Sequence, residues 1–247
     1  MEFTSPRFQG DPLLLEILND PNTGQKKLKK GSPEGPVLKV QQALLDLHWV
    51  EDAGLIAEEL FVDGDYGPAT EGTVRVYKAF YHLTFPPGDP FGIVDGYTGP
   101  LTLAVLDRHC TLFDEARAAL HAKADELIGK GWPLKLVPDY PAPGARPIIG
   151  TFGASIVFNM EGVAGEIAYS PTNGAFEVHG PIYIEWLRRG YATGHFGFPI
   201  SDEYEDGNGL RVSDFEGGSI HLNADTGRLS GSGPGLADER MRSAIKF

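Results

Sequence analysis

The densest cluster of acidic side chains in the sequence is Asp202, Glu203 and Glu205. Two carboxylates placed close together can act as general acid and base in the cleavage of a glycosidic bond, so this cluster raises the question of a hydrolase. A solvated loop is the interpretation that we prefer. A glycan hydrolase or amidase is therefore only a minor alternative, and no catalytic residue is predicted.

Further motifs that suggest chemistry fail on their spacing. Asp225-Thr226-Gly227 spells the triplet of aspartic proteases, but the equivalent residues of an internal repeat are Thr172-Asn173-Gly174, so a hairpin turn is predicted. Asp63-Gly64-Asp65 resembles the start of a calcium loop whose later ligand positions are missing. Seven histidines raise the question of zinc, but His109, His121, His179, His195 and His221 lack the spacing of zinc ligands and are each expected to stand alone. Cys110 lies in an apolar helical context, which does not favour a reactive thiol. The sequence therefore predicts neither a metal site nor a cofactor.

Composition narrows the classes of partner. The formal net charge is −13, which disfavours a nucleic-acid partner because phosphate backbones are repelled. No apolar run is long enough for a membrane span, so we expect no membrane insertion. The start of the chain lacks the pattern of a signal peptide. A place in the cell envelope or outside the cell would then require another export route or a removed signal, and the alternative is a cytoplasmic protein awaiting delivery by an injection system.

A repeated motif organises the first half of the chain. VDGDYGPAT at 62–70 and VDGYTGPLT at 94–102 share six residues in nine positions. Asp-Gly is typical of a turn, and Pro68 and Pro100 suit the first turn of a helix. Thr70 and Thr102 can bond back to the loop backbone. With an earlier apolar stripe at Val37, Val40, Leu44 and Leu47, the pattern predicts three short helices over 25–111.

A second repeat, with an offset of 53 residues, organises the other half. GEIAYSPTNG at 165–174 and GSIHLNADTG at 218–227 each predict a strand that enters a tight turn. Between them Pro181 opens a predicted helix and Gly190 ends it. FDEARAALHAKADELIGKG forms another amphipathic pattern. We interpret 112–230 as two units, each a helix, a loop and a hairpin, with the Pro-rich stretch 133–147 inserted within a unit.

The first half resembles the three-helix peptidoglycan-binding-like family. The strings that carry the resemblance are LKKGSPEGPVLKVQQALLDL, VDGDYGPATEGTVRVYKAF and IVDGYTGPLTLAVL. Val40-Gln41 stands for the Leu-Gln pair of that family and Tyr77-Lys78 stands for its Phe-Gln pair. The longer segment WVEDAGLIAEELF departs from the family pattern. The resemblance implies binding to bacterial peptidoglycan, although some relatives are protein-interaction modules.

The string ATGHFGFPISDE resembles the LGFP repeat of cell-wall-associated proteins, with Phe196-Gly197-Phe198-Pro199 as its core and Phe196 in place of Leu. This resemblance implies a role in the cell envelope through attachment to glycan. The opening string FTSPRFQGDPLLLEIL resembles the arm of some standalone proteins near phage-tail-like injection systems. That likeness implies the alternative of a structural, adaptor or cargo protein with a protein partner.

Together these patterns predict an α+β multidomain protein. Its parts are an N-terminal arm (1–24), a small three-helix peptidoglycan-binding-like domain (25–111), a β-hairpin-rich LGFP-repeat domain with short helices (112–230) and a flexible tail (231–247). The expected function is non-catalytic binding of peptidoglycan or another envelope glycan by two tethered modules, with little dependence on salt. Candidate ligand contacts are Asp63, Tyr66, Thr70, Tyr97, Thr98, Tyr169, Trp186, Tyr191, His195, Asp202 and Glu203, since aromatic faces and polar tips suit sugar rings. For each, a role in the turn or in the core is the alternative.

Overall fold

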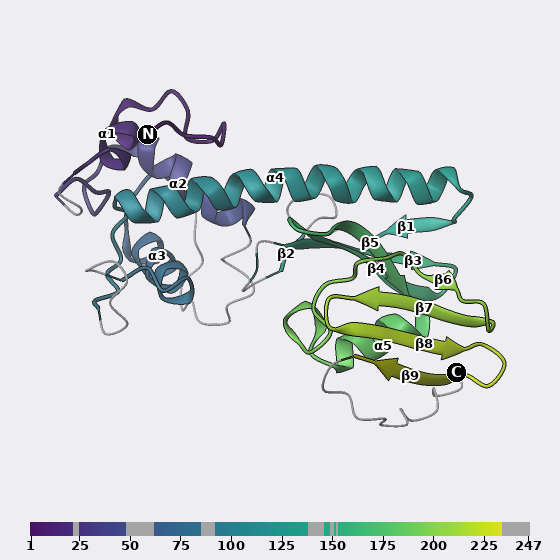
Figure 1. The fold of residues 1–247 in the computed structure, drawn as a ribbon. Coiled ribbons are helices and arrows are strands. Elements are labelled where there is room, and N and C mark those ends of the chain that lie inside the picture. Colours follow the sequence, from purple (N-terminus) through teal and green to yellow (C-terminus); the bar gives the residue numbers. More distant parts are fainter. Residues whose placement is uncertain are drawn as a thin grey trace. The chain divides into compact units, whose positions relative to one another are not determined.

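The computed structural model describes residues 1–21, 25–47, 62–84, 92–137, 146–148, 151 and 153–233. Within these residues the chain is α+β, with helices and two antiparallel sheets (Figure 1). The chain divides into two compact units, Met1–Phe113 and Asp114–Phe247. We call them the helical unit and the sheet unit. The segment at 49–61 that departs from the three-helix family pattern lies outside the described residues.

The helical unit contains α1 (Pro12–Leu18), α2 (Glu34–Asp46), α3 (Pro68–Phe80) and the first part of α4 (Pro100–Gly129). The predicted starts at Pro68 and Pro100 are confirmed, because each proline opens its helix. The predicted stripe of α2 is also confirmed: Val37, Val40, Leu44 and Leu47 are buried. Burying each of these side chains contributes about 1.5–3 kcal/mol, which makes this stripe a main part of the core.

The first residues of the chain are not a separate arm. Phe3, Phe8, Leu14 and Ile17 are all buried in the helical unit. The carboxylate of Asp107 in α4 accepts hydrogen bonds from the backbone N–H of Thr4 and Ser5 and from the Thr4 hydroxyl. The segment before α2 therefore belongs to the core of this unit. The sequence did not indicate this, because residues 1–11 show no helical stripe.

Helix α4 is one continuous helix of 30 residues, whereas the sequence interpretation placed a boundary at 111–112 and a separate helix after it. The prediction of short helices is wrong here because no glycine or proline lies between Pro100 and Gly129 to interrupt the helix. Gly131, at a φ of +88°, follows its end. The division between the two units falls within this helix. In the sheet unit, its buried stripe is Ala116, Leu120, Ala124 and Leu127.

The sheet unit contains two antiparallel sheets. The first sheet has the order β1 (Leu134–Leu136), β3 (Ala154–Met160), β4 (Val163–Ser170), β5 (Gly174–His179), and β2 (Arg146–Pro147) pairs with the same strand β3 as β1. The second sheet has the order β6 (Tyr204–Glu205), β7 (Leu210–Phe215), β8 (Gly218–Asn223), β9 (Arg228–Ser232). Helix α5 (Gly180–Arg188) and a short 3-10 turn (Tyr191–Thr193) connect the sheets (Figure 1).

The two hairpins predicted from the second repeat are confirmed as β4–β5 and β8–β9. The triplet at 225–227 lies in the turn of the second hairpin, as expected. Each sheet follows a helix and ends in a three-stranded meander, β3–β4–β5 in the first sheet and β7–β8–β9 in the second, so this pattern occurs twice in the sheet unit. Of the stretch 133–147, Leu134–Leu136 and Arg146–Pro147 form β1 and β2 of the first sheet, and residues 138–145 lie outside the described residues. Strand β9 continues to Ser232, so the first two residues of the predicted tail belong to this strand.

Helix α5 lies against both sheets and carries the centre of the core. It contacts β4, β5 and β8. Trp186 is fully buried, and around it the core contains Ile148, Ala168, Val178, Ile182, Tyr183, Ala192, Phe196, Phe198, Phe215, Ile220 and Leu229. The start of this helix at Gly180-Pro181 and the left-handed Gly190 after its end agree with the sequence.

Candidate functional site

The first repeated turn is held by the side chain of Gln41. Its Nε2 lies 2.9 Å from Asp63 Oδ1, 3.0 Å from the carbonyl oxygen of Asp65 and 2.9 Å from the Thr70 hydroxyl. Its Oε1 accepts hydrogen bonds from the backbone N–H of Asp63 and Gly64. Gln41 is fully buried. Asp63 and Thr70 therefore use their polar atoms to shape the turn.

The second turn repeats this arrangement with a charged side chain. Lys78 occupies in α3 the place that Gln41 has in α2, and its ammonium contacts Asp95 Oδ1 and the Tyr97 carbonyl. Asp95 Oδ1 also accepts from the backbone N–H of Tyr97, as Asp63 accepts from Asp65. The motif is thus the same helix-start device twice, as the sequence predicted.

Two further candidates of the helical unit join the turns to each other. The Tyr66 hydroxyl donates to the Gly96 carbonyl at 2.8 Å and lies 2.8 Å from the Thr98 hydroxyl. Tyr66 is 2% exposed and Thr98 is 0% exposed. Burial raises the pKa of Tyr66 well above its ordinary value. A ligand at the surface does not reach these two side chains, so they are structural residues.

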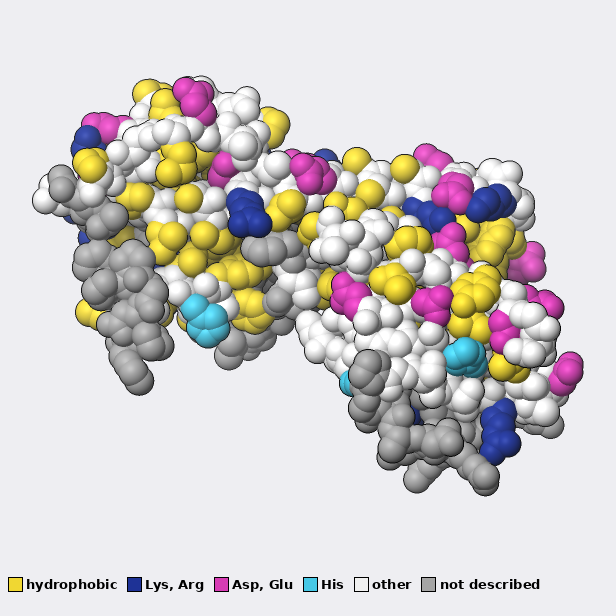
Figure 2. Space-filling model, viewed as in Figure 1, with side chains coloured by type: hydrophobic (Ala, Val, Ile, Leu, Met, Phe, Trp, Pro, Cys, Tyr) yellow, Lys and Arg dark blue, Asp and Glu magenta, His cyan; other side chains and the backbone are white. Residues whose placement is uncertain are grey.

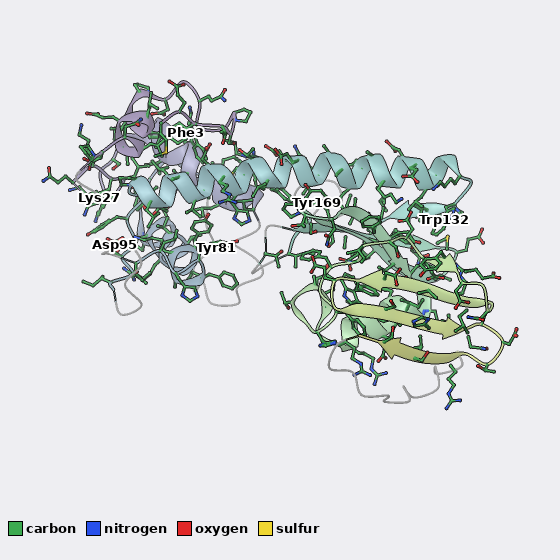
Figure 3. All side chains as sticks on the ribbon, viewed as in Figure 1. Phe3, Lys27, Tyr81, Asp95, Trp132 and Tyr169 are labelled. Atoms are coloured by element: carbon green, nitrogen blue, oxygen red, sulfur yellow. The ribbon has the colours of Figure 1, made fainter. Side chains whose placement is uncertain are left out.

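Tyr97 is the candidate of the helical unit that keeps an accessible ring. The Lys27 ammonium lies 4.3 Å from the centre of this ring, within the range of a cation–π contact. Backbone hydrogen bonds between Leu28 and Thr98 fix the two segments together. Figure 3 shows Lys27 and Asp95 at the same end of the helical unit. Tyr97 does not join the other candidates in a shared site.

In the sheet unit, Trp186 and Tyr191 support the loop that carries the Phe-Gly-Phe-Pro motif, residues 194–200, which we call the GFP loop. Trp186 Nε1 donates to the Gly197 carbonyl at 2.9 Å. The Tyr191 ring packs on Trp186 with 4.5 Å between ring centres. The Tyr191 hydroxyl donates to Glu166, and burial together with the Glu166 charge raises the pKa of Tyr191. Both side chains serve the core, which corrects their assignment as ligand contacts.

The GFP loop needs glycine at two positions. Gly197 has a φ of +67°, and a Cβ there would lie 2.4 Å from Glu216 Oε2. A Cβ on Gly217 would lie 2.1 Å from the carbonyl oxygen of His195. The loop therefore lies directly against the β7–β8 turn, which only glycines permit.

An exposed polar edge results from this packing. Glu216 Oε1 accepts from Asn173 Nδ2 at 2.7 Å, and Glu216 Oε2 accepts from the Phe198 N–H at 3.1 Å. His195 and Glu216 are exposed and Asn173 is half-buried. We call Asn173, His195 and Glu216 the GFP edge. The sequence indicated His195 alone, because Asn173 and Glu216 lie 43 residues apart and no local pattern connects them.

Asp202 and Glu203 do not lie in a solvated loop, which corrects the interpretation of the acidic cluster. They belong to a charged cluster with Lys123, Glu177, His179 and Arg211. Glu203 Oε1 lies 2.6 Å from Arg211, and Asp202 Oδ2 contacts the Lys123 ammonium. The side chain of Glu203 is 4% exposed and that of Glu177 is 1% exposed. Only Glu205 of the original cluster is exposed.

His179 is the centre of this charged cluster, so the expectation that each histidine stands alone is wrong for it. Its Nδ1 lies 2.7 Å from Glu177 and 3.5 Å from Glu203, and its ring packs edge-on against Trp132 at 5.2 Å. Burial lowers the pKa of His179, but the bond to Glu177 and the two carboxylate charges outweigh burial and raise the pKa above its ordinary value. Burial raises the pKa of Glu203 in spite of the adjacent cations.

The geometry of the charged cluster is that of a structural network. Glu177 Oε1 accepts from the Glu203 N–H at 2.9 Å, its Oε2 faces His179, and the two oxygens of Glu203 face Arg211 and His179. All four carboxylate oxygens are thus engaged within the protein. No group of His, Cys, Asp and Glu that could hold a metal ion occurs in the described part of the chain.

Tyr169 is in the same hairpin as Asn173 and pairs with Ala175, but it is a member of neither the GFP edge nor the charged cluster. It is half-buried on β4, and burial with the Glu115 charge raises the pKa of its phenol. Figure 3 shows Tyr169 and Trp132 at separate places in the sheet unit. Among the eleven candidate contacts, Asp202 and Glu203 lie together in the charged cluster. The other candidates that lie together are the pairs Asp63 and Thr70, Tyr66 and Thr98, and Trp186 and Tyr191. All of these groupings stabilise the fold.

Comparison with known proteins identifies one region of the chain. No curated protein matches the chain. Among the described helices, none combines the length and the apolar character that crossing a membrane requires. Residues 196–237 match the LGFP repeat, from the GFP loop through the second sheet. This segment of the sheet unit is therefore an LGFP repeat, which suggests a binding role at the cell wall or envelope.

Proposed function

We propose that the protein is a non-catalytic binder of peptidoglycan or another envelope glycan and that the GFP edge is its contact surface in the sheet unit. The LGFP match over 196–237 is the observation that carries this proposal. Asn173, His195 and Glu216 place amide, imidazole and carboxylate groups on one exposed edge. Such planar polar groups can donate to and accept from sugar hydroxyls.

Binding without catalysis agrees with the state of the acidic residues. A glycosidase needs two carboxyl groups facing a substrate, one of them free to give a proton. The two carboxylates of the charged cluster that lie nearest His179, Glu177 and Glu203, are instead buried and occupied by His179, Arg211 and backbone. Figure 2 shows the exposed Asp and Glu side chains scattered over this face, without one acidic patch.

Retention on insoluble peptidoglycan tests the proposal. The full chain should remain bound after washing at low and at moderate salt, because short-range contacts rather than long-range attraction hold an acidic protein to an acidic polymer. His195→Ala and Asn173→Ala should each weaken retention about two- to tenfold, the effect of one lost hydrogen bond. Asp225→Ala, an exposed change in the second hairpin turn, is the matched control.

The same experiment distinguishes the alternatives. No retention of the full chain at either salt concentration contradicts glycan binding, and co-purification with a large assembly would then favour the adaptor or cargo role. Release of soluble sugar or muropeptide from the polymer contradicts the non-catalytic assignment. Equal retention of the wild type and both GFP-edge variants would leave glycan binding in place and remove the GFP edge as its surface.

A further inference from the structure

The charged cluster joins the LGFP segment to the part of the sheet unit that precedes it. Its six members come from both sides of residue 196: Lys123, Glu177 and His179 precede the matched residues, whereas Asp202, Glu203 and Arg211 lie within them. The Glu203 N–H donates to Glu177 Oε1 at 2.9 Å, and the Glu177 N–H donates to Asp202 Oδ1 at 3.2 Å. Carboxylates therefore accept these two hydrogen bonds, which connect β5 to the segment 201–205.

The cluster is electrically balanced when His179 carries a proton. Each of its three carboxylates then has a cation, which is Lys123 for Asp202, Arg211 for Glu203 and His179 for Glu177. Among the described residues, His179 is the only cation in contact with Glu177, whose side chain is 1% exposed. When His179 loses its proton, Glu177 remains as a buried charge without a counter-charge, which is strongly unfavourable.

The charged groups that face His179 decide where this proton is lost. Burial lowers the pKa of His179, but the bond to Glu177 and the charges of Glu177 and Glu203 outweigh burial, while the charge of Arg211 opposes them in part. The pKa of His179 is therefore raised above its ordinary value. The imidazole is protonated at pH 6 and loses its proton as the pH rises through the pKa of the folded state.

The remaining neighbours of His179 do not compete for its proton. The ring of Trp132, which packs edge-on at 5.2 Å, and Gly165, which pairs with His179 on β4, carry no charge. On α4, Lys123 belongs to the cluster, and the exposed Glu126 contacts the ammonium of Lys123. The acidic groups that hold the proton are therefore the two carboxylates in contact with the imidazole.

The segment 201–205 is bound on two sides. Strand β6 within it has two residues, Tyr204 and Glu205, which are both exposed at the edge of the second sheet. Toward β7, the Ser201 hydroxyl accepts from the Asp214 N–H at 3.0 Å, and the Ile200 N–H donates to the Asp214 carbonyl at 2.8 Å. These bonds contain no group of the charged cluster. The segment can therefore leave β5 while it stays on β7, which is a local opening rather than unfolding.

We propose that His179, Glu177 and Glu203 form a pH switch, which binds the segment 201–205 to β5 while the imidazole is protonated and releases it when the proton passes to solvent. At low pH all contacts of the charged cluster are made. As the pH rises, Glu177 loses its counter-charge and moves toward water, which opens the two hydrogen bonds between β5 and the segment. The switch is a property of the fold and does not depend on the proposed glycan binding.

Residue-resolved hydrogen exchange of the full chain at pH 6 and pH 9 tests the switch. The amides of Glu177 and Glu203 are the reporters, because each donates to a carboxylate of the charged cluster. Their protection, corrected for the intrinsic exchange rate at each pH, should fall about tenfold from pH 6 to pH 9, the effect of losing one charge-assisted hydrogen bond. The amides that join β7 to β8 are the internal control and should keep their protection.

Two substitutions separate the proton from the fold. Glu177→Gln keeps the shape and the acceptor oxygen of the side chain but removes the buried charge, so the Glu203 amide should be protected equally at both pH values. His179→Asn removes the titrating group, so protection should stay at the low level of the wild type at pH 9. The exposed changes Glu205→Gln and His195→Asn are the matched controls and should respond to pH as the wild type does. If His179→Asn unfolds, the wild type and Glu177→Gln decide the result.

The outcomes divide clearly. A fall in the wild type that both Glu177→Gln and His179→Asn abolish supports the switch. Equal protection of the two reporter amides at pH 6 and pH 9 in the wild type overturns it. A fall that persists in Glu177→Gln assigns the pH dependence to another group and overturns it as well. A fall of the same size in the amides between β7 and β8 indicates unfolding of the whole unit and overturns the local opening.

Discussion

Replacing Gln41 with Met should strongly destabilise the helical unit. The substitution keeps the length and most of the volume of the side chain, so it creates little cavity. It removes every hydrogen bond that the Gln41 side chain makes to the first repeated turn. The groups left without Gln41 are the amides of Asp63 and Gly64 and the polar oxygens of Asp63, Asp65 and Thr70.

The expected size of the effect is about 3 kcal/mol. Nε2 of Gln41 has two hydrogens for three acceptors and Oε1 accepts two bonds, so the side chain makes about four hydrogen bonds at a time. Each contributes about 1 kcal/mol net, and a buried donor left unpaired costs about 1–3 kcal/mol. Asp63 and Asp65 are exposed and water can replace part of their loss, but Gly64 is buried.

Urea unfolding and native hydrogen exchange measure this effect. Exchange of the amides over 62–80 should become faster by the factor that corresponds to about 3 kcal/mol, while the amides of the sheet unit keep their rates. The matched control is the neighbouring Gln42→Met. Gln42 is exposed and bonds only Asp46 among the described residues, so the change should stay within about 0.5 kcal/mol. A loss for Gln41→Met no larger than that of the control would refute the role assigned to Gln41.

Two further predictions concern the sheet unit. The pKa of His179 is raised above about 6.5, so the stabilising contribution of its charged form is complete below that pH and is lost as the pH rises through the pKa of the folded state. The melting temperature should therefore fall between pH 6 and 9. His179→Asn should reduce this fall, whereas the exposed control His195→Asn should not. Gly197→Ala should destabilise the sheet unit by more than about 1 kcal/mol, because a φ of +67° is strained for alanine and the new Cβ meets Glu216. The control Gly207→Ala should change the urea midpoint little, since the space around Gly207 is open. Equal effects of the two changes would contradict the packing described for the GFP loop.

Elements that depend on local signals follow from the sequence. Pro68 and Pro100 are the first residues of α3 and α4, and Pro181 is the second residue of α5, because a proline loses nothing at a position where the N–H would have no partner. The two hairpins follow from the residues of their turns. The length of α4 does not follow from a motif, since the amphipathic stretch FDEARAALHAKADELIGKG was interpreted as the first helix of a new unit although no helix-breaking residue precedes it.

The site is less accessible to sequence reasoning because its residues are distant in the chain. Asp202 and Glu203 look solvated in the sequence, and their partners Lys123 and Glu177 lie 79 and 26 residues away. Trp186 has a flat ring suitable for a sugar, but tertiary packing buries it. The aromatic type of a residue does not reveal its burial, and only the arrangement of the strands and of α5 decides it.

The side chains that hold the two repeated turns of the helical unit differ in charge, although the two turns have the same arrangement. An uncharged amide closes one bend, and an ammonium facing Asp95, with side chains 9% and 32% exposed, closes the other. Dissolved ions weaken the attraction between two opposite charges that water can reach more than they weaken the bonds that the neutral Gln41 amide makes to Asp63, Asp65 and Thr70. Concentrated salt should therefore loosen the turn before α4 sooner than the turn before α3. Two turns of nearly the same arrangement thus differ in how strongly their stability depends on ionic strength.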